Sequence, residues 1–211
     1  RGFIPAFAVD VGANRGQFAR EALDLFPYAC IHCFEPLPEM SRSLRQWAAD
    51  LGHRRVVVHQ AAVGDELGRL TMHEHVDHSP SSSLLERTKL ATELFPQTCR
   101  TAACEVDVVT LDHWAEQEPV HTVAPILLKI DVQGYESAVL RGASVFLRAI
   151  EACVIEVSTV PLYQGQARFA ELVSLLDVAG LVYVGNLLQV HARDGSVLYV
   201  DAVFRRSGPG V

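Results

Sequence analysis

The sequence has 211 residues, enough for one domain with a complete hydrophobic core. Hydrophobic residues make up 49% of it, which excludes a disordered protein, and a net charge of −7 without a basic stripe argues against a nucleic-acid partner. No apolar run approaches the roughly 20 residues that a membrane-spanning helix needs.

The cysteines favour a reduced, cytoplasmic protein. Their number is odd, and several of them lie in apolar, strand-like runs: Cys30, Cys33, Cys99, Cys104 and Cys153. Buried thiols of this kind fit a reducing compartment better than disulfides do. Cys30 and Cys33 have the spacing of a redox or zinc motif, but no second pair follows, so no metal site is predicted there.

The first stretch with a chemical signature covers residues 7–18, where an apolar run ends in Asp10 and opens into a turn of small residues before a helix. This strand, turn and helix are typical of the start of a nucleotide-binding α/β unit. Glycine lets a ligand approach the backbone, and the helix N-terminus offers free N–H groups. A carboxylate here would repel a pyrophosphate but would suit an ammonium group, such as that of S-adenosylmethionine. The candidate cofactor-binding residues are Asp10, Gly12, Ala13, Asn14, Gly16 and Phe18.

A second acid ends the next predicted strand. Residues 29–34 form an apolar run that Glu35 and Pro36 close. An acid at the end of the second strand can accept hydrogen bonds from both ribose hydroxyls of an adenosyl group, and Pro36 stops the strand. Glu35 could instead be a helix cap or a surface acid, but its position one strand after the first motif favours hydrogen bonds to the ribose.

The α/β alternation then continues. A helix is predicted over 40–51 and a strand over 54–63, which ends in a turn at Asp65. This alternation predicts a parallel, doubly wound sheet with helices on both faces. The third strand would bring Ala61 and Ala62 close to the adenine ring.

Residues 66–110 interrupt the rhythm and are predicted to be an insertion in a single domain that covers 1–211. The expected elements are a strand over 69–75, a polar loop over 78–83, a helix over 84–95 and a strand over 104–109. Such an insertion on the ligand side of a sheet usually determines substrate selectivity. Three histidines cluster in it, namely His73, His75 and His78, and a solvated strand edge is favoured because no acid or thiol completes a metal site.

The following strand, over 125–132, carries Asp131 at its carboxyl end, the edge where open α/β sheets bind ligands. A helix is expected over 135–147 and another buried strand over 151–158, with Glu156 near its end. A buried acid is costly unless it is paired. Lys129 shares a face with Asp131 and would be the partner of Glu156 if the two strands are neighbours. A structural ion pair and a substrate contact both remain open for Glu156.

The chain ends with a predicted helix over 169–179 and two strands over 181–188 and 196–205, joined through a hairpin turn at 193–195. The sheet therefore finishes with an antiparallel pair. No repeat or linker interrupts the chain, which again favours one domain.

Taken together, the motifs resemble the FkbM family of methyltransferases over about residues 7–205. The matching segments are those at 10–16, 34–36, 61–65, 82–84, 128–136 and 154–156. The resemblance implies a class I, Rossmann-like methyltransferase fold with a seven-stranded sheet whose last strand is antiparallel. It also implies an S-adenosylmethionine-dependent O-methyltransferase that acts on hydroxyls of sugars, glycolipids and polyketide natural products. One departure is Gln133, where many members carry Glu.

The resemblance further implies roles for individual residues. Asp10, Gly12, Asn14 and Gly16 would hold the methionine portion and Glu35 the ribose. Ala62 and Asp65 would lie beside the adenine, and Asp131 near the reactive sulfonium.

Methyl transfer to an alcohol benefits from a base. The candidates are Asp131, Glu156 and His78, and a divalent cation is an open alternative. Two other functions also remain open: a NAD-dependent oxidoreductase, since Glu35 could hold its ribose, and a non-catalytic S-adenosylmethionine-binding module. The expected partner is a small-molecule or glycolipid acceptor, and a homodimer is not excluded.

Overall fold

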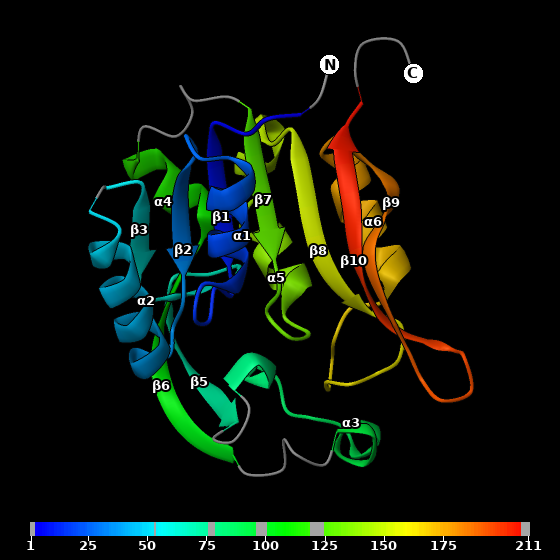
Figure 1. Cartoon of the computed structure of the whole chain (residues 1–211). Coiled ribbons are helices and arrows are strands. Elements are labelled where there is room, and N and C mark those ends of the chain that lie inside the picture. The colour runs from blue at the N-terminus through cyan, green and yellow to red at the C-terminus, as the bar shows by residue number, and fades with distance from the viewer. Residues whose placement is uncertain (1–2, 53, 76–78, 96–100, 119–124, 208–211) are drawn as a thin grey trace.

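The computed structural model describes residues 3–52, 54–75, 79–95, 101–118 and 125–207. Its centre is a seven-stranded sheet in the order β3-β2-β1-β7-β8-β10-β9 (Figure 1). The strands are β1 (Phe7–Val11), β2 (Cys30–Phe34), β3 (Val56–His59), β7 (Ile126–Ile130), β8 (Ala152–Ser158), β9 (Leu181–His191) and β10 (Val197–Arg206). All neighbouring pairs from β3 to β8 are parallel, whereas β10 is antiparallel to both β8 and β9. The predicted class I arrangement is confirmed.

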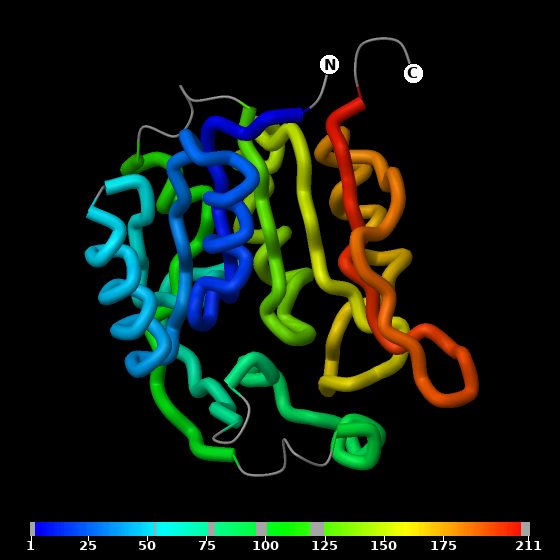
Figure 2. The backbone as a smooth tube through the Cα atoms, in the orientation of Figure 1, coloured from blue at the N-terminus to red at the C-terminus, as the bar shows by residue number. Residues whose placement is uncertain are grey.

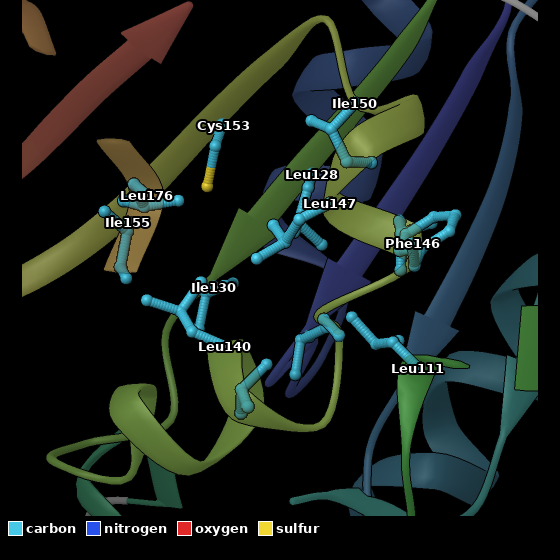
Figure 3. Packing of buried hydrophobic residues seen from close by; sticks show 14 of the residues in the cluster. Leu111, Leu128, Ile130, Leu140, Phe146, Leu147, Ile150, Cys153, Ile155 and Leu176 are labelled. Atoms are coloured by element: carbon cyan, nitrogen blue, oxygen red, sulfur yellow. The ribbon is translucent and has the colours of Figure 1, made fainter. Parts of the chain in front are cut away.

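Helices cover both faces of this sheet. One face carries α1 (Gln17–Leu25) and α2 (Pro38–Asp50), and the other carries α4 (Leu111–Gln117), α5 (Glu136–Arg141), the 3₁₀ helix η4 (Phe146–Ala149) and α6 (Phe169–Val178) (Figure 1). Alternate residues of each strand enter different cores because successive side chains point to opposite faces. In β7, Leu128 and Ile130 pack with Phe146 in the larger core (Figure 3), while Leu127 belongs to the core beneath α1 and α2.

A second, three-stranded sheet has the order β4-β6-β5, and two of its strands, β5 and β6, lie in the predicted insertion. Its strands are β4 (Ala62–Val63), β5 (Gly68–His75) and β6 (Thr101–Val109). The prediction of one strand over 54–63 is therefore wrong. The His59 carbonyl accepts the last bond on the β2 side, from Glu35 N, and the chain then leaves the main sheet so that Ala62 and Val63 pair with β6.

Two predicted helices are shorter than expected. The helix predicted over 84–95 is only α3 (Lys89–Leu94), because Thr88 caps it by accepting a hydrogen bond from Ala91 N. The helix predicted over 135–147 ends at Arg141. There Gly142 approaches Gly64 so closely that an added Cβ would lie 1.9 Å from the Gly64 carbonyl oxygen.

Residues 79–95, which we call the covering segment, lie across the carboxyl ends of β1 and β7 (Figure 2). The segment begins with the 3₁₀ helix η1 (Ser79–Ser81) and ends with α3. No helix within the described ranges is long and apolar enough to cross a membrane.

Candidate functional site

A cavity of about 780 Å³ begins at the carboxyl ends of the central strands, beneath the covering segment, and continues along the sheet face as far as Phe3, Ala152 and Arg205. Five charged residues lie on the same face of the sheet, the face that carries α1 and α2, because the strand period is two. These are Asp10 on β1, Lys129 on β7, Asp131 just after β7, Glu156 on β8 and Asp201 on β10. The register places Asp10 beside Lys129 and Asp201 beside Glu156. Lys129, Asp131, Glu156 and Asp201 line the cavity.

The turn after β1 is shaped mainly by contacts within the chain. The N–H groups of Gly12 and Ala13 donate to the Phe34 carbonyl, at 3.1 and 3.0 Å. Gly12 has a φ of +80°, and a Cβ there would lie 1.9 Å from the Asp131 carbonyl oxygen. Glycine at this position therefore lets the exits of β1 and β7 touch.

Gly16 has a different task, because a Cβ there would lie 2.5 Å from Leu44 Cδ1 on α2. Glycine at this position leaves room for the Leu44 side chain. Of the predicted cofactor-binding residues in this turn, Gly12, Ala13, Asn14 and Phe18 line the cavity.

Glu35 follows β2 and is buried at the cavity wall, next to Pro36. One carboxyl oxygen accepts a hydrogen bond from Asn14 N and the other from Leu37 N, both at 2.8 Å. Burial raises the pKa of Glu35 to about 7, although these two N–H groups act in the opposite direction. Each oxygen keeps lone-pair capacity for one more donor. The carboxyl group is therefore held rigidly and can still accept ligand hydroxyls.

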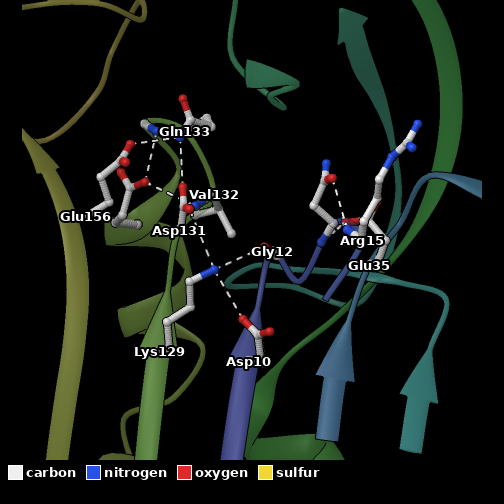
Figure 4. Close-up of polar contacts among 12 residues, drawn as sticks. Asp10, Gly12, Arg15, Glu35, Lys129, Asp131, Val132, Gln133 and Glu156 are labelled. Atoms are coloured by element: carbon white, nitrogen blue, oxygen red, sulfur yellow. Dashed lines mark hydrogen bonds and ion pairs between the residues drawn. The ribbon is translucent and has the colours of Figure 1, made fainter. Parts of the chain in front are cut away.

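Asp10 is completely buried and lies behind the turn (Figure 4). Its Oδ1 lies 3.1 Å from Lys129 Nζ, and the same ammonium donates to the Gly12 carbonyl at 3.1 Å and lies 3.6 Å from Asp131 Oδ2. Burial alone would lower the pKa of Lys129, but the neighbouring carboxylates, Asp10 foremost, raise it above its ordinary value. The charged Lys129 therefore already lies beside Asp10. Direct contact of Asp10 with the ammonium group of a ligand stays a prediction.

Glu156 takes a partner other than the expected one. Gln133 Nε2 donates to Glu156 Oε1 and to Asp131 Oδ1, both at 2.7 Å (Figure 4). In the sequence, Gln133 stands out only as a departure from the family pattern, and Asp201 does not stand out at all. The position of Gln133, a polar residue in the turn that follows a central strand, was the signal that could have identified it as a site residue. Asp201 could be found only from the antiparallel register of β10.

The covering segment is bound to the site through its own hydroxyls. Ser83 Oγ donates to the Gln133 carbonyl at 2.6 Å and accepts a bond from Leu85 N, while Ser82 Oγ accepts from His75 N. The Ser83 hydroxyl therefore both donates and accepts within the protein, whereas Ser82, which accepts one bond, lines the cavity.

These features can be set beside known proteins. The family model described as Methyltransferase FkbM domain matches residues 10–183. The chain belongs to the FkbM methyltransferase family. A curated relative, the 2-O-methyltransferase NoeI of Sinorhizobium fredii, is 27% identical over 179 residues, which are 82% of this chain and 72% of NoeI.

Two solved structures share the fold of this FkbM domain. An FkbM methyltransferase from Methylobacillus flagellatus KT superposes with a TM-score of 0.57 at 15% identity, over 97% of this chain. Only 44% of that structure is matched, so the present chain spans less than half its length. Magnesium protoporphyrin IX methyltransferase from Synechocystis, solved with bound S-adenosylmethionine, matches 97% of this chain and 71% of its own, with a TM-score of 0.53 at 10% identity.

The remaining candidates in the FkbM domain divide into two groups. Ala61 and Ala62 line the same cavity as Glu35, whereas Asp65 forms an ion pair with Arg141 at 3.0 Å. His78, the third candidate base, lies outside the described residues. Within the described ranges, no three side chains of His, Cys, Asp or Glu are grouped so that they could hold a metal ion.

Proposed function

We propose that this FkbM domain uses S-adenosylmethionine to methylate a hydroxyl group of a sugar, glycolipid or polyketide-type acceptor. The observation that carries the proposal is the joint position of Glu35 and Asp131 on the wall of one cavity at the carboxyl ends of parallel strands. Family membership supports methyl transfer, and the relative named a 2-O-methyltransferase supports oxygen as the acceptor atom.

The residues present fit the cofactor. A volume of about 780 Å³ lies within the range typical of small-molecule sites. Glu35 would receive the ribose hydroxyls, and the small side chains of Ala61 and Ala62 leave room for an adenine ring. The turn at Gly12–Asn14 would face the methionine portion. A methyl group activated by a sulfonium is the chemistry that S-adenosylmethionine supplies when bound.

The chain's own residues would align the acceptor and remove its proton. The Asp131 side chain is 33% exposed and lies beside Lys129, which offsets the negative charge of the site. A positioned base of this kind typically contributes about 10²–10⁴-fold to a rate. We assign proton acceptance to Asp131, with Glu156 behind it as the second acid. Alignment of hydroxyl and methyl donor supplies the remaining acceleration.

Calorimetric titration with S-adenosylhomocysteine and with NAD tests the cofactor. We expect binding of the first and none of the second, and the reverse would favour an oxidoreductase. A screen for transfer of labelled methyl groups to deoxysugars, glycolipids and macrolides tests the reaction. Cofactor binding without transfer to any acceptor would favour a non-catalytic binding module.

A further inference from the structure

Gln133 stands in the exit turn of β7 with a left-handed backbone, φ +56°, between two acids of the site. Its side-chain amide has two N–H bonds, and each is directed at a different carboxyl group, Asp131 Oδ1 and Glu156 Oε1 (Figure 4). The amide is thus shared between the strand ends of β7 and β8. Both distances are 2.7 Å, at the short end of the range for N–H···O hydrogen bonds.

The orientation of this amide is fixed from behind. Its Oε1 lies 2.8 Å from the hydroxyl of Tyr163, which donates either to that oxygen or to the Ser81 carbonyl at 3.1 Å. The Gln133 backbone carbonyl accepts from Ser83 Oγ. The carboxyl oxygens accept and the Tyr163 hydroxyl can donate, so the NH₂ group faces the acids and the amide oxygen faces Tyr163.

Glu156 has mostly acidic surroundings. Burial raises its pKa well above the ordinary value, and the nearby carboxyl groups, Asp131 first, add to this, while the bond from Gln133 lowers it. The titratable groups that act on Glu156 or respond to it are Lys129, Asp131, Glu136, Tyr163, Tyr199 and Asp201. A neutral double donor lets two of these acids sit side by side without adding another charge, whereas a glutamate at 133 would add a third acid.

We propose that Gln133 is a positioning residue that holds Asp131 and Glu156 as a hydrogen-bonded pair, with Tyr163 fixing the direction of its amide. The pair then presents the partly exposed Asp131 to the cavity in one orientation. Its catalytic consequence rests on the proposed function, but the arrangement itself can be tested without any acceptor.

The experiment follows the side-chain carboxyl carbons of ¹³C-labelled Asp and Glu by NMR from pH 4 to 9, with Glu156→Gln to assign the Glu156 signal. Gln133→Met keeps the length of the side chain and removes the amide, so the pKa of Glu156 should rise. Tyr163→Phe keeps the ring and should move the pKa of Glu156 in the same direction by a smaller amount. Gln164→Met is the control, because the amide of Gln164 donates to Glu86 at 3.1 Å on the exposed surface, and this variant should leave the pKa of Glu156 unchanged.

Gln133→Glu provides a second, nearly isosteric variant if Gln133→Met does not fold. It should add one more titrating group, and that group should have an elevated pKa. An unmoved Glu156 signal in folded Gln133→Met, or a residue 133 carboxyl that titrates as an ordinary surface acid, would overturn the proposal. Failure of S-adenosylhomocysteine to bind would overturn the proposed function and leave these titrations unaffected. If methyl transfer is found, the acidic limb of its pH profile should move to higher pH in Gln133→Glu.

Discussion

At the scale of single residues, Glu35 offers the sharpest test of the cofactor site. Glu35→Ala should weaken S-adenosylhomocysteine binding by about 1–3 kcal/mol, because the ribose hydroxyls lose their acceptor. The backbone N–H groups of Asn14 and Leu37 also lose their acceptor in Glu35→Ala. Glu35→Gln is therefore the safer variant, because its side chain retains one oxygen. Glu39→Ala, at an exposed position on α2, is the control. Calorimetry that finds equal affinity in all four proteins would remove Glu35 from the site.

The raised pKa of Glu35 adds a pH dependence to this prediction. The ionised carboxylate can accept two hydroxyls, whereas the protonated form loses part of that capacity. With a pKa of about 7, affinity for S-adenosylhomocysteine should increase from pH 6 to pH 8. The increase should be absent in Glu35→Gln, which does not titrate. A wild-type affinity that falls over this interval would contradict the assignment.

Another residue pair should make stability depend on pH. His32 Nδ1 lies 3.0 Å from His59 Nε2 in an aromatic pocket with Trp114, and burial lowers the pKa of each to about 4. The folded protein therefore resists protonation that the unfolded chain accepts below about pH 6.5, so this contribution to stability is lost as pH falls from 6.5 toward 4. Buried acids such as Glu35 and Glu136 act in the opposite direction.

Comparison of the wild type with His32→Gln isolates the contribution of the histidines to the pH dependence of stability, because Glu35 and Glu136 are present in both proteins. The free energy of unfolding, measured by urea denaturation, should fall more between pH 7 and pH 5 in the wild type than in His32→Gln. Equal slopes would mean that the imidazoles take up protons freely in the folded state.

At the scale of elements, hydrogen bonds at both ends of the covering segment join it to the rest of the protein. Thr88 caps α3, its N–H donates to the Leu162 carbonyl at 2.9 Å and its hydroxyl donates to the Pro161 carbonyl at 2.7 Å. At the other end, the side-chain amide of Asn14 donates to Ser79 Oγ at 3.2 Å. Since Asn14 belongs to the cofactor turn, we expect ligand binding and the order of this segment to be linked.

Hydrogen exchange measures that link. Amides of residues 79–95 should exchange faster than those of β7 in the free protein and should slow when S-adenosylhomocysteine and an acceptor bind. Loss of the Thr88 cap in Thr88→Ala costs about 1 kcal/mol and should raise local exchange roughly fivefold. Thr92→Ala, within the same helix but not at its cap, is the control. Slow exchange in the free protein would show that the segment is a fixed part of the scaffold.

At the scale of the whole molecule, the order of strands and helices was predictable because the apolar runs of β1, β2, β7 and β8 indicate buried parallel strands directly. The end of β3 could not be predicted, because the chain leaves the main sheet after His59 to pair with β6, which lies far along the chain. The shared face of Lys129 and Asp131 followed from period two. The partner of Glu156 could not be predicted from the sequence, because the side-chain amide of a turn residue such as Gln133 produces no periodic pattern. The packing roles of Gly12 and Gly16 could not be predicted either, because they depend on neighbours distant in sequence.

The two cores suggest a final test, since each contains a completely buried cysteine. Cys33 belongs to the core beneath α1 and α2, and Cys153 to the core beneath α4, α5 and α6. Burial raises the pKa of both thiols, so their reactive thiolates are scarce in the native protein. Cys30 and Cys104 are partly exposed and should react first with a thiol reagent.

Because both cores share the strands of one sheet, neither face should open alone. We therefore expect Cys33 and Cys153 to be labelled at one common rate, with the same urea dependence as global unfolding. Denatured, unreduced protein should show five free thiols, Cys99 included, and Cys33→Ala and Cys153→Ala assign the two slow signals. If Cys33 reacts much faster than Cys153, the layer of α1 and α2 separates from the sheet on its own, and the cofactor turn between β1 and α1 opens with it.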